Sequence, residues 1–492
     1  MIAHPVVAAL VVLGSGCPSS GGSTNGSRAR LTQPCSCPAL LEMAIAKVEA
    51  TYIAYRLEVD STSLQDYEAR KAAARQRARV EDIDCFTVLT GWLDGFRDGH
   101  LFLFESPRFI EEQLDSLART AVRTDWSDAR LRAALRDAVE LDPIEGFWYA
   151  RESRYGIVRD PADSSAFVGI VISTTEEGWD AGELKVRFRK TGPSRYAATY
   201  RVADHSTRRY TADLHRGTLL VMPAMGWGKL SPLPAGDRGL LDPRDPTAPV
   251  LREIEPGVVL ASVPSHDPRH RPRLDSLVSA ARERLLAARL LIVDLRGNGG
   301  GSSLTTAPLM PFIYARPERE PPGRGGEPVV LASAENIAYF SRWKRGADTP
   351  TWLTSLLERM GRSYGEIVPF MDPPDTTRGW LPDTSYASPP QVAILTDGGV
   401  ASAAEAFLLF ALHSPKVTLF GEPTAGMIDY QNVSIVPIGC PGSSVYLGYP
   451  TIAASSELPR GGLNRTGIVP HVRLDLSRVD PIAAILHHYA RG

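Results

Sequence analysis

The stretch from Leu290 to Ser303, LLIVDLRGNGGGSS, constrains the fold more than any other part of the sequence. Its first half is a short apolar run that ends in Asp294, which is typical of a strand buried on both faces of a sheet. Its second half has almost no side chains. The loop after this strand therefore brings bare backbone close to another group. A phosphate, a cofactor and a developing negative charge are the candidates.

Further apolar strands are expected at VVLASV, QVAILT and KVTLF, and helices at LDSLVSAARERLL and SAAEAFLLFAL. Apolar strands that alternate with helices predict a largely parallel sheet covered on both faces. We expect this α/β core to span residues 250–492. It includes a long insertion at 316–390, rich in Pro, Gly and Arg, which we expect to hold at least one helix, TWLTSLLERMG, and to form long loops over one end of the sheet.

Two other patterns precede the core. Residues 31–140 carry apolar side chains at helical spacing and predict an N-terminal helical bundle. Residues 144–225 alternate apolar and charged side chains, as in GELKVRFRK, and predict a small antiparallel β domain. The 492-residue chain is thus expected to be a multidomain α+β protein. Its net charge of −2 argues against nucleic acid as a partner.

The N-terminus, MIAHPVVAALVVLGSGC, predicts export. A short apolar run followed by small residues is the pattern of a secretory signal peptide. We interpret residues 1–30 as a signal peptide and a flexible tether. The small residues before Cys17 resemble a bacterial lipoprotein cleavage site, so Cys17 is the expected lipid anchor. The expected location is the periplasm or the cell envelope.

Four cysteines follow the tether: Cys35, Cys37, Cys85 and Cys440. In an exported chain they can pair, and four cysteines allow three connectivities. A bond from Cys85 to either Cys35 or Cys37 would join the N-terminal helices. Buried thiols are the alternative. No Cys or His pair follows at zinc-ligand spacing, which argues against a zinc site. Neither a metal nor an organic cofactor is expected.

The glycine loop does not match a nucleotide-binding motif. A dinucleotide fingerprint requires a third glycine where this chain has Ser302, and no G-K-[ST] of a phosphate-binding loop is present. The segment VAILTDGGVASAAEAF instead leads from a strand through a Gly-Gly turn to Ser402 at the start of a helix. A helix N-terminus favours developing negative charge, although a serine there is also a common helix cap.

Taken together, LLIVDLRGNGGG, VAILTDGGVASAAEAF, VTLFGEPTAG and the terminal GIVPHV resemble the tail-specific protease superfamily, peptidase family S41. This group includes the C-terminal processing peptidases and the tricorn core. The resemblance implies a ClpP/crotonase-like α/β core and a serine peptidase with Ser402 as nucleophile. It also implies an oxyanion hole formed by the N–H of Gly299 or Gly300, of which we favour Gly300, with that of Ala403.

The resemblance offers two kinds of base. C-terminal processing members use a lysine about 25 residues after the serine, where this chain has Met427, and Lys416 lies on the preceding strand. The tricorn-like branch uses a histidine of the helical N-terminal region. The segment FRDGHLFLF is similar to that region and indicates His100. His266, which follows a strand of the core, is the alternative.

The residue that orients the base is left open. A Glu usually precedes the last motif, and this chain has Asn464 there. Asn464, Glu405 and Asp98 are the candidates.

Residues 144–225 lack the carboxylate-binding loop of a PDZ domain. We therefore expect an exported serine-type endopeptidase that acts on proteins or peptides. A catalytically decayed S41-like lipoprotein that binds peptide or glycan is the alternative, and an esterase or other acyl hydrolase is a third.

Overall fold

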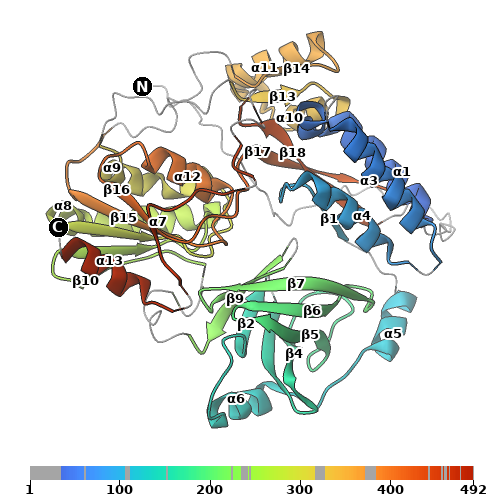
Figure 1. The fold of residues 1–492 in the computed structure, drawn as a ribbon, viewed down its shortest axis with the longest axis horizontal. Coiled ribbons are helices and arrows are strands. Elements are labelled where there is room, and N and C mark those ends of the chain that lie inside the picture. Colours follow the sequence, from blue (N-terminus) through green and yellow to red (C-terminus); the bar gives the residue numbers. More distant parts are fainter. Residues whose placement is uncertain are drawn as a thin grey trace. The chain divides into compact units, whose positions relative to one another are not determined.

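A computed structural model of the chain describes residues 35–59, 63–81, 83–105, 111–150, 153–222, 225–233, 242, 245, 247–315, 327–371, 384–440, 444–455, 458, 462–464, 466–476 and 478–490. The predicted signal peptide, tether and Cys17 lie outside these residues. The chain forms two compact units. The first unit comprises Met1–Pro107, Gly323–Thr376 and Asp429–Gly462, and the second comprises Arg108–Pro322, Thr377–Ile428 and Leu463–Gly492. The fold is mixed helix and sheet with several sheets, which confirms the multidomain α+β class (Figure 1).

In the first unit, N-terminal helices pack on an antiparallel sheet built largely from later segments. The sheet has the order β1-β18-β13-β14, and β17 also pairs with β18. Its strands are β1 (Phe102–Glu105), β13 (Val329–Leu331), β14 (Ile367–Pro369), β17 (Tyr430–Pro437) and β18 (Val445–Ala453). The helices are α1 (Cys37–Thr51), α2 (Ile53–Glu58), α3 (Leu64–Ala78), α4 (Cys85–Leu93), η1 (Asp94–Phe96), α10 (Ala334–Ser341), η5 (Gly346–Asp348) and α11 (Thr351–Arg362). Tyr52, Leu89 and Tyr449 are fully buried in their shared core.

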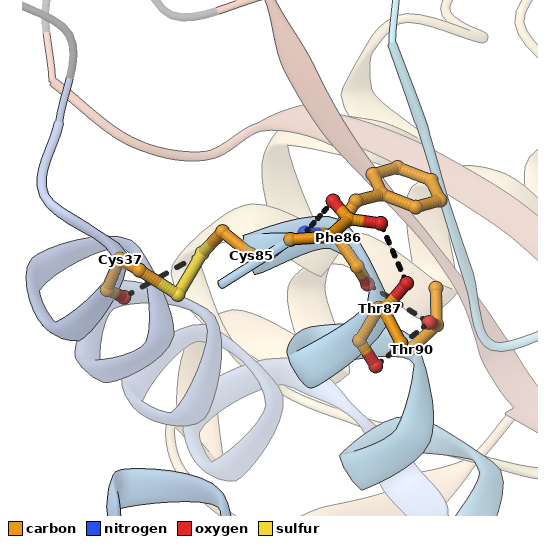
Figure 2. The surroundings of a disulfide bond; sticks show 6 residues. Cys37, Cys85, Phe86, Thr87 and Thr90 are labelled. Atoms are coloured by element: carbon orange, nitrogen blue, oxygen red, sulfur yellow. Dashed lines mark hydrogen bonds between the residues drawn. A yellow bond between two sulfur atoms is a disulfide. The ribbon is translucent and has the colours of Figure 1, made fainter. Parts of the chain in front are cut away.

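Two disulfides join the beginning of this unit to distant segments. Cys37 at the start of α1 bonds Cys85 at the start of α4, so one of the two pairings proposed for Cys85 is present (Figure 2). Cys35 bonds Cys440, which follows β17, across a sequence separation of 405. The side chain of Asp84 caps α4 by accepting the N–H of Phe86 at 3.2 Å.

The predicted insertion lies partly in this unit. Its residues 327–371 form β13, α10, η5, α11 and β14. Helix α11 is the helix expected at TWLTSLLERMG, whereas the other elements stand where long loops were expected. A buried apolar cluster explains the difference, because Phe340, Leu356 and Met360 pack together and against the sheet. Residues 316–326 and 372–383 of the insertion lie outside the described part of the chain.

The second unit begins with helices α5 (Glu111–Thr120) and α6 (Asp128–Asp137) and a closed antiparallel barrel. Its strands are β2 (Gly146–Ala150), β3 (Ser153–Asp160), β4 (Asp163–Ser173), β5 (Leu184–Gly192), β6 (Arg195–Arg201), β7 (Thr207–His215), β8 (Leu219–Met222) and β9 (Met225–Ser231). Large aromatic side chains fill it: the rings of Tyr155 and Trp227 stack with centroids 4.1 Å apart, and Trp148 is fully buried.

The rest of the second unit is an α/β sheet with the order β10-β11-β12-β15-β16-β19. Its strands are β10 (Val250–Glu255), β11 (Val258–Ser262), β12 (Leu290–Asp294), β15 (Gln391–Thr396), β16 (Val417–Gly421) and β19 (Val472–Arg473). The helical segments are η3 (Pro268–His270), α7 (Arg271–Ala280), α8 (Arg282–Ala287), η4 (Ser303–Leu309), α9 (Met310–Ile313), α12 (Ala403–Ala411) and α13 (Pro481–Ala490). From β11 to β19 all pairs are parallel, and apolar clusters cover both faces.

This topology brings two loops to one edge. Strands β12 and β15 are parallel neighbours, with Asp294 opposite Leu395. The glycine loop that follows β12 and the turn that follows β15 therefore leave the sheet side by side. Within the described ranges, no helix is long and apolar enough to cross a membrane.

Candidate active site

Ser402 has a strained backbone at the turn between β15 and α12. Its φ is 57° and its ψ is −120°, and it directly precedes the first residue of α12. A residue with a Cβ rarely adopts positive φ, and such strain of about 1–3 kcal/mol gathers at functional sites. A nucleophilic serine on a sharp strand-to-helix turn has this arrangement, because the turn presents the hydroxyl at the edge of the sheet.

The glycine loop lies directly against Ser402. A Cβ on Gly300 would be 2.7 Å from the Cβ of Ser402 and 3.0 Å from the nitrogen of Ala403. Gly300 also has a φ of 98°, so both the space and the backbone require glycine there. At Gly299, no atom of the described residues lies within 4 Å of the corresponding position. The structure thus brings together Ser402, Ala403 and the predicted oxyanion glycines.

Asn298 decides which amides of this loop are available. The N–H of Gly300 donates to Asn298 Oδ1 at 3.0 Å. The N–H groups of Gly299 and Ala403 have no acceptor among the residues that the structure describes. A tetrahedral oxyanion needs donors that are free to bind it. Gly300 is therefore required because it has no side chain, whereas the N–H groups of Gly299 and Ala403 are the ones available to bind an oxyanion.

Glu405 fastens the start of α12 to a neighbouring loop. Its buried carboxylate accepts the N–H of Ser402 at 3.0 Å and that of Met427 at 2.7 Å. It also accepts the Thr424 hydroxyl at 2.5 Å and the Gly426 N–H at 2.8 Å. A carboxylate has about four acceptor positions, and these four donors fill them. The contacts of Glu405 thus indicate that it holds backbone rather than orients a base.

Asn464 lies against the loop that Glu405 holds. Its Oδ1 accepts the N–H of Ile428 at 3.0 Å. A Cβ on Gly426 would be 3.2 Å from the carbonyl carbon of Asn464, so the two backbones are packed closely. Asn464 and Ser402 both belong to the second unit.

His266 supports the glycine loop from within the core. It is fully buried, its N–H donates to Gly300 O at 3.1 Å, and its Nε2 lies 3.1 Å from Thr306 Oγ1. Burial lowers the pKa of His266 to about 4, although a hydrogen bond to Asn298 works in the opposite direction. A histidine this buried is a weak base at neutral pH, so its contacts favour a structural role.

His100 belongs to the first unit, where it lies in a buried turn with Asp98. The N–H of His100 donates to Asp98 Oδ1 at 3.0 Å, and its Nδ1 is 3.9 Å from the same oxygen. Tyr52 donates its hydroxyl to Asp98 Oδ2 at 2.7 Å. Burial, followed by the charge of Asp98, raises the pKa of Tyr52 well above its usual value. Tyr52 therefore remains protonated and holds the carboxylate beside His100.

Lys416 is committed to other contacts. Its Nζ donates to Phe312 O at 2.8 Å and to Tyr386 O at 2.9 Å. Burial lowers its pKa to about 8. It precedes β16, whereas Ser402 follows the carboxyl end of the parallel strand β15, so the two lie toward opposite edges of the sheet.

Sequence reasoning missed three residues that hold the candidate residues: Tyr52, beside Asp98 in the first unit, and Asn298 and Asp397, in the second unit. The carboxylate of Asp397 accepts the N–H of Gly297 at 2.8 Å and that of Gly399 at 3.0 Å, which links the two loops. The Asp-Gly pair directly after the strand was the available signal, since Asp commonly binds backbone two residues ahead. In the described ranges, no group of three or more His, Cys, Asp or Glu is arranged to hold a metal.

Comparison with known proteins gives fold-level likenesses. No protein-family profile and no curated protein matches the sequence. Among solved structures, the chain is similar to mature CPAF, with 13% identity, a TM-score of 0.45, and coverage of 89% of this chain and 93% of that one. The chain is also similar to the photosystem II D1 C-terminal processing protease, with 13% identity, a TM-score of 0.35, and coverage of 89% of this chain and 93% of that one. For the tricorn protease the identity is 12% and the TM-score 0.36, with coverage of 92% of this chain and 37% of that one.

These structures include a C-terminal processing protease and the tricorn protease, the two kinds of protein named in the resemblance of the motifs. At 12–13% identity the likenesses assign no role to any residue of this chain. The function proposed below therefore rests on the residues of the site.

Proposed function

We propose that this protein is an exported serine-type endopeptidase with a ClpP/crotonase-like core and Ser402 as its nucleophile. The observation that carries the proposal is the strained backbone of Ser402, with φ at 57°, packed against the bare backbone of Gly300. The surrounding fold must maintain strain of this kind, and it is typical of residues with a chemical task.

In the proposed reaction, Ser402 Oγ forms a bond to the peptide carbonyl carbon while its proton passes to His100. The N–H groups of Gly299 and Ala403 stabilise the negative oxygen, and the positive end of α12 adds to this field. The C–N bond then breaks, and His100 returns the proton to the leaving amine. Water attacks the acyl ester in the same manner and regenerates Ser402.

His100 is proposed as the base because the contacts of its turn fix the position of the histidine. Tyr52 holds Asp98, and Asp98 binds the backbone of His100 and lies beside its ring. Asp98 is accordingly the favoured orienting residue, since Glu405 has its acceptor positions filled. We expect His100→Ala to lower kcat by at least about 100-fold, the usual contribution of a general base. Lys416→Met, a control that removes another titrating side chain, should leave kcat unchanged.

Export and a lipid anchor at Cys17 belong to the same proposal. The apolar N-terminus supports export, and the two disulfides support an oxidising compartment such as the periplasm. Globomycin-sensitive processing of the full chain in a bacterial host would test the lipid anchor at Cys17. A mature protein that does not begin at Cys17 would contradict it.

The alternative is a decayed peptidase that binds peptide or glycan. It is motivated by Asn464, which stands where relatives of this type carry a Glu. The strain at Ser402 and the fit of Gly300 favour the enzyme, because a binding scaffold has no need of either. Unfolded proteins incubated with the parent or with Ser402→Ala, followed by mass spectrometry of new termini, separate these functions. New termini only with the parent are expected. Ester hydrolysis without new termini would indicate the third function, an acyl hydrolase.

A further inference from the structure

The turn between β7 and β8 of the barrel carries a buried arginine. Arg216 has a φ of 56°, another positive value for a residue with a Cβ. Its side chain is 2% exposed, and its Nη1 lies 3.0 Å from Asp294 Oδ2. The same nitrogen is 3.4 Å from the hydroxyl of Ser262, the last residue of β11. The barrel thus extends a charged side chain into the edge of the sheet where the glycine loop begins.

Asp294 is the acid that ends β12, directly before that loop. Arg296 donates to its Oδ1 at 2.9 Å and to its Oδ2 at 2.8 Å. Burial alone would raise the pKa of Asp294, but the charges of Arg216 and Arg296 outweigh burial and hold it at about 2. Asp294 therefore stays ionised, with Arg296 bound to both carboxylate oxygens and Arg216 paired with Oδ2.

The same turn touches the site at two more points. A Cβ on Gly297 would be 3.0 Å from a methyl carbon of Leu219, the first residue of β8. His215 has Nδ1 3.7 Å from Asp397 Oδ2, and its ring would be 3.0 Å from a Cβ on Gly399. The turn is therefore in contact with both the glycine loop and the Gly-Gly turn that leads to Ser402.

We propose that the β7–β8 turn of the barrel is a positioning element for the glycine loop, with Arg216 as the positioning residue. This inference rests on the proposed peptidase function. Oxyanion stabilisation requires donors fixed within a few tenths of an ångström, so a loop without side chains needs support from outside itself. The barrel provides that support through one buried charge and two packing contacts.

A purely stabilising role explains the arrangement less well. Burying an ion pair often gives no net stability compared with apolar side chains of similar size, because desolvation offsets the attraction. The charge of Arg216 instead fixes the position of Asp294, and with it the start of the glycine loop. The first effect expected from its loss is therefore on the rate of the chemical step.

The test compares Arg216→Gln, Arg216→Lys and Leu219→Ala with the parent in the full chain. Arg195→Gln is the matched control, because Arg195 is a barrel arginine 2.6 Å from Asp213 but its side chain is 63% exposed. We measure kcat and KM on a peptide amide, and hydrogen exchange of residues 295–301. Arg216→Gln should lower kcat at least about 10-fold with KM changed less than about 3-fold, as expected when a transition-state interaction is lost. Arg216→Lys should restore part of kcat, and Leu219→Ala should give a smaller loss.

Exchange of the loop should become faster in Arg216→Gln and Leu219→Ala, but not in Arg195→Gln. Unchanged kcat and unchanged exchange in folded Arg216→Gln would overturn the inference. If that variant does not fold, the same readouts in Leu219→Ala and Arg216→Lys decide it, because neither leaves Asp294 without a barrel cation. A parent without turnover would contradict the proposed function instead, and loop exchange would still show whether the turn holds the loop.

Discussion

A Cβ on Gly300 would lie only 2.7 Å from the Cβ of Ser402. Real Cβ atoms do not approach each other this closely, so the glycine loop and the serine turn fit only while residue 300 has no side chain. The distance links the two motifs that are 102 residues apart in the sequence and explains why both must be present. It also defines the part of the account that is easiest to test.

Gly300→Ala should abolish activity without unfolding the second unit. The added methyl group forces Ser402 or the loop to move, and a displaced oxyanion donor reduces kcat by about 100–1000-fold. Gly299→Ala is the matched control, since the structure places no described atom within 4 Å of its Cβ and alanine keeps the N–H. It should retain kcat within about 10-fold. Equal losses in the two variants, measured on a peptide amide, would refute the assigned packing.

Glu405→Ala should destabilise the protein and inactivate it together. Removal of the carboxylate takes the acceptor from the buried N–H of Gly426 and from the half-buried N–H groups of Ser402 and Met427. Loss of such charge-assisted contacts typically lowers the free energy of unfolding by about 3–5 kcal/mol. Urea unfolding followed by tryptophan fluorescence measures the change. Glu405→Gln should show a smaller loss, because one amide oxygen still accepts. Full stability in Glu405→Ala would contradict the holding role.

His266 predicts a specific dependence of stability on pH. Its pKa is about 4 in the folded chain and about 6.5 when unfolded, so only the unfolded form binds its proton between these values. Stability is therefore unaffected above about pH 6.5 and falls as pH decreases toward 4. The loss is at most about 3 kcal/mol at 1.36 kcal/mol per pKa unit.

The measurement is the unfolding free energy of the parent and of His266→Gln between pH 4 and pH 8. Carboxylates titrate equally in both proteins, so the difference between the curves isolates His266. The curve of His266→Gln should fall less steeply below pH 6.5. Parallel curves would show that His266 is not buried as described.

The disulfides predict a defined peptide map. Non-reducing digestion of the protein produced in an oxidising compartment should yield a Cys35–Cys440 pair and a Cys37–Cys85 pair. Removal of either bond by paired Cys→Ser substitution should lower the free energy of unfolding by about 2–5 kcal/mol. Thermal unfolding with and without reductant provides the comparison. A map dominated by Cys35–Cys85 would contradict the fold of the first unit.

The α/β core was predictable because its signals are local. Runs such as LLIVDL and QVAILT are apolar throughout, which a strand covered on both faces requires, and both are strands β12 and β15. Ser402 was placed correctly at the start of a helix for the same reason. The contact between Ser402 and Gly300 also followed, since neighbouring parallel strands end at one edge.

The remaining features depend on long-range pairing that no local pattern reveals. Cys35 bonds Cys440, and Phe102–Glu105 pairs with β18, more than 300 residues away. Apart from the helix expected at TWLTSLLERMG, the segment 327–371 was expected to form long loops because it is rich in Pro and Gly, but its apolar residues form a buried cluster of the first unit. Nor could the sequence show that Arg216 reaches Asp294, since an arginine in a hairpin turn is normally solvated.

Fluorophosphonate labelling of the purified protein at Ser402 tests the central claim most directly. An activated serine beside free oxyanion donors reacts with this probe, whereas an ordinary helix-capping serine does not. We expect one label per chain, located at Ser402 by mass spectrometry, and none in folded Ser402→Ala. A folded parent that stays unlabelled at Ser402, under conditions where a known serine peptidase is labelled completely, would contradict the account.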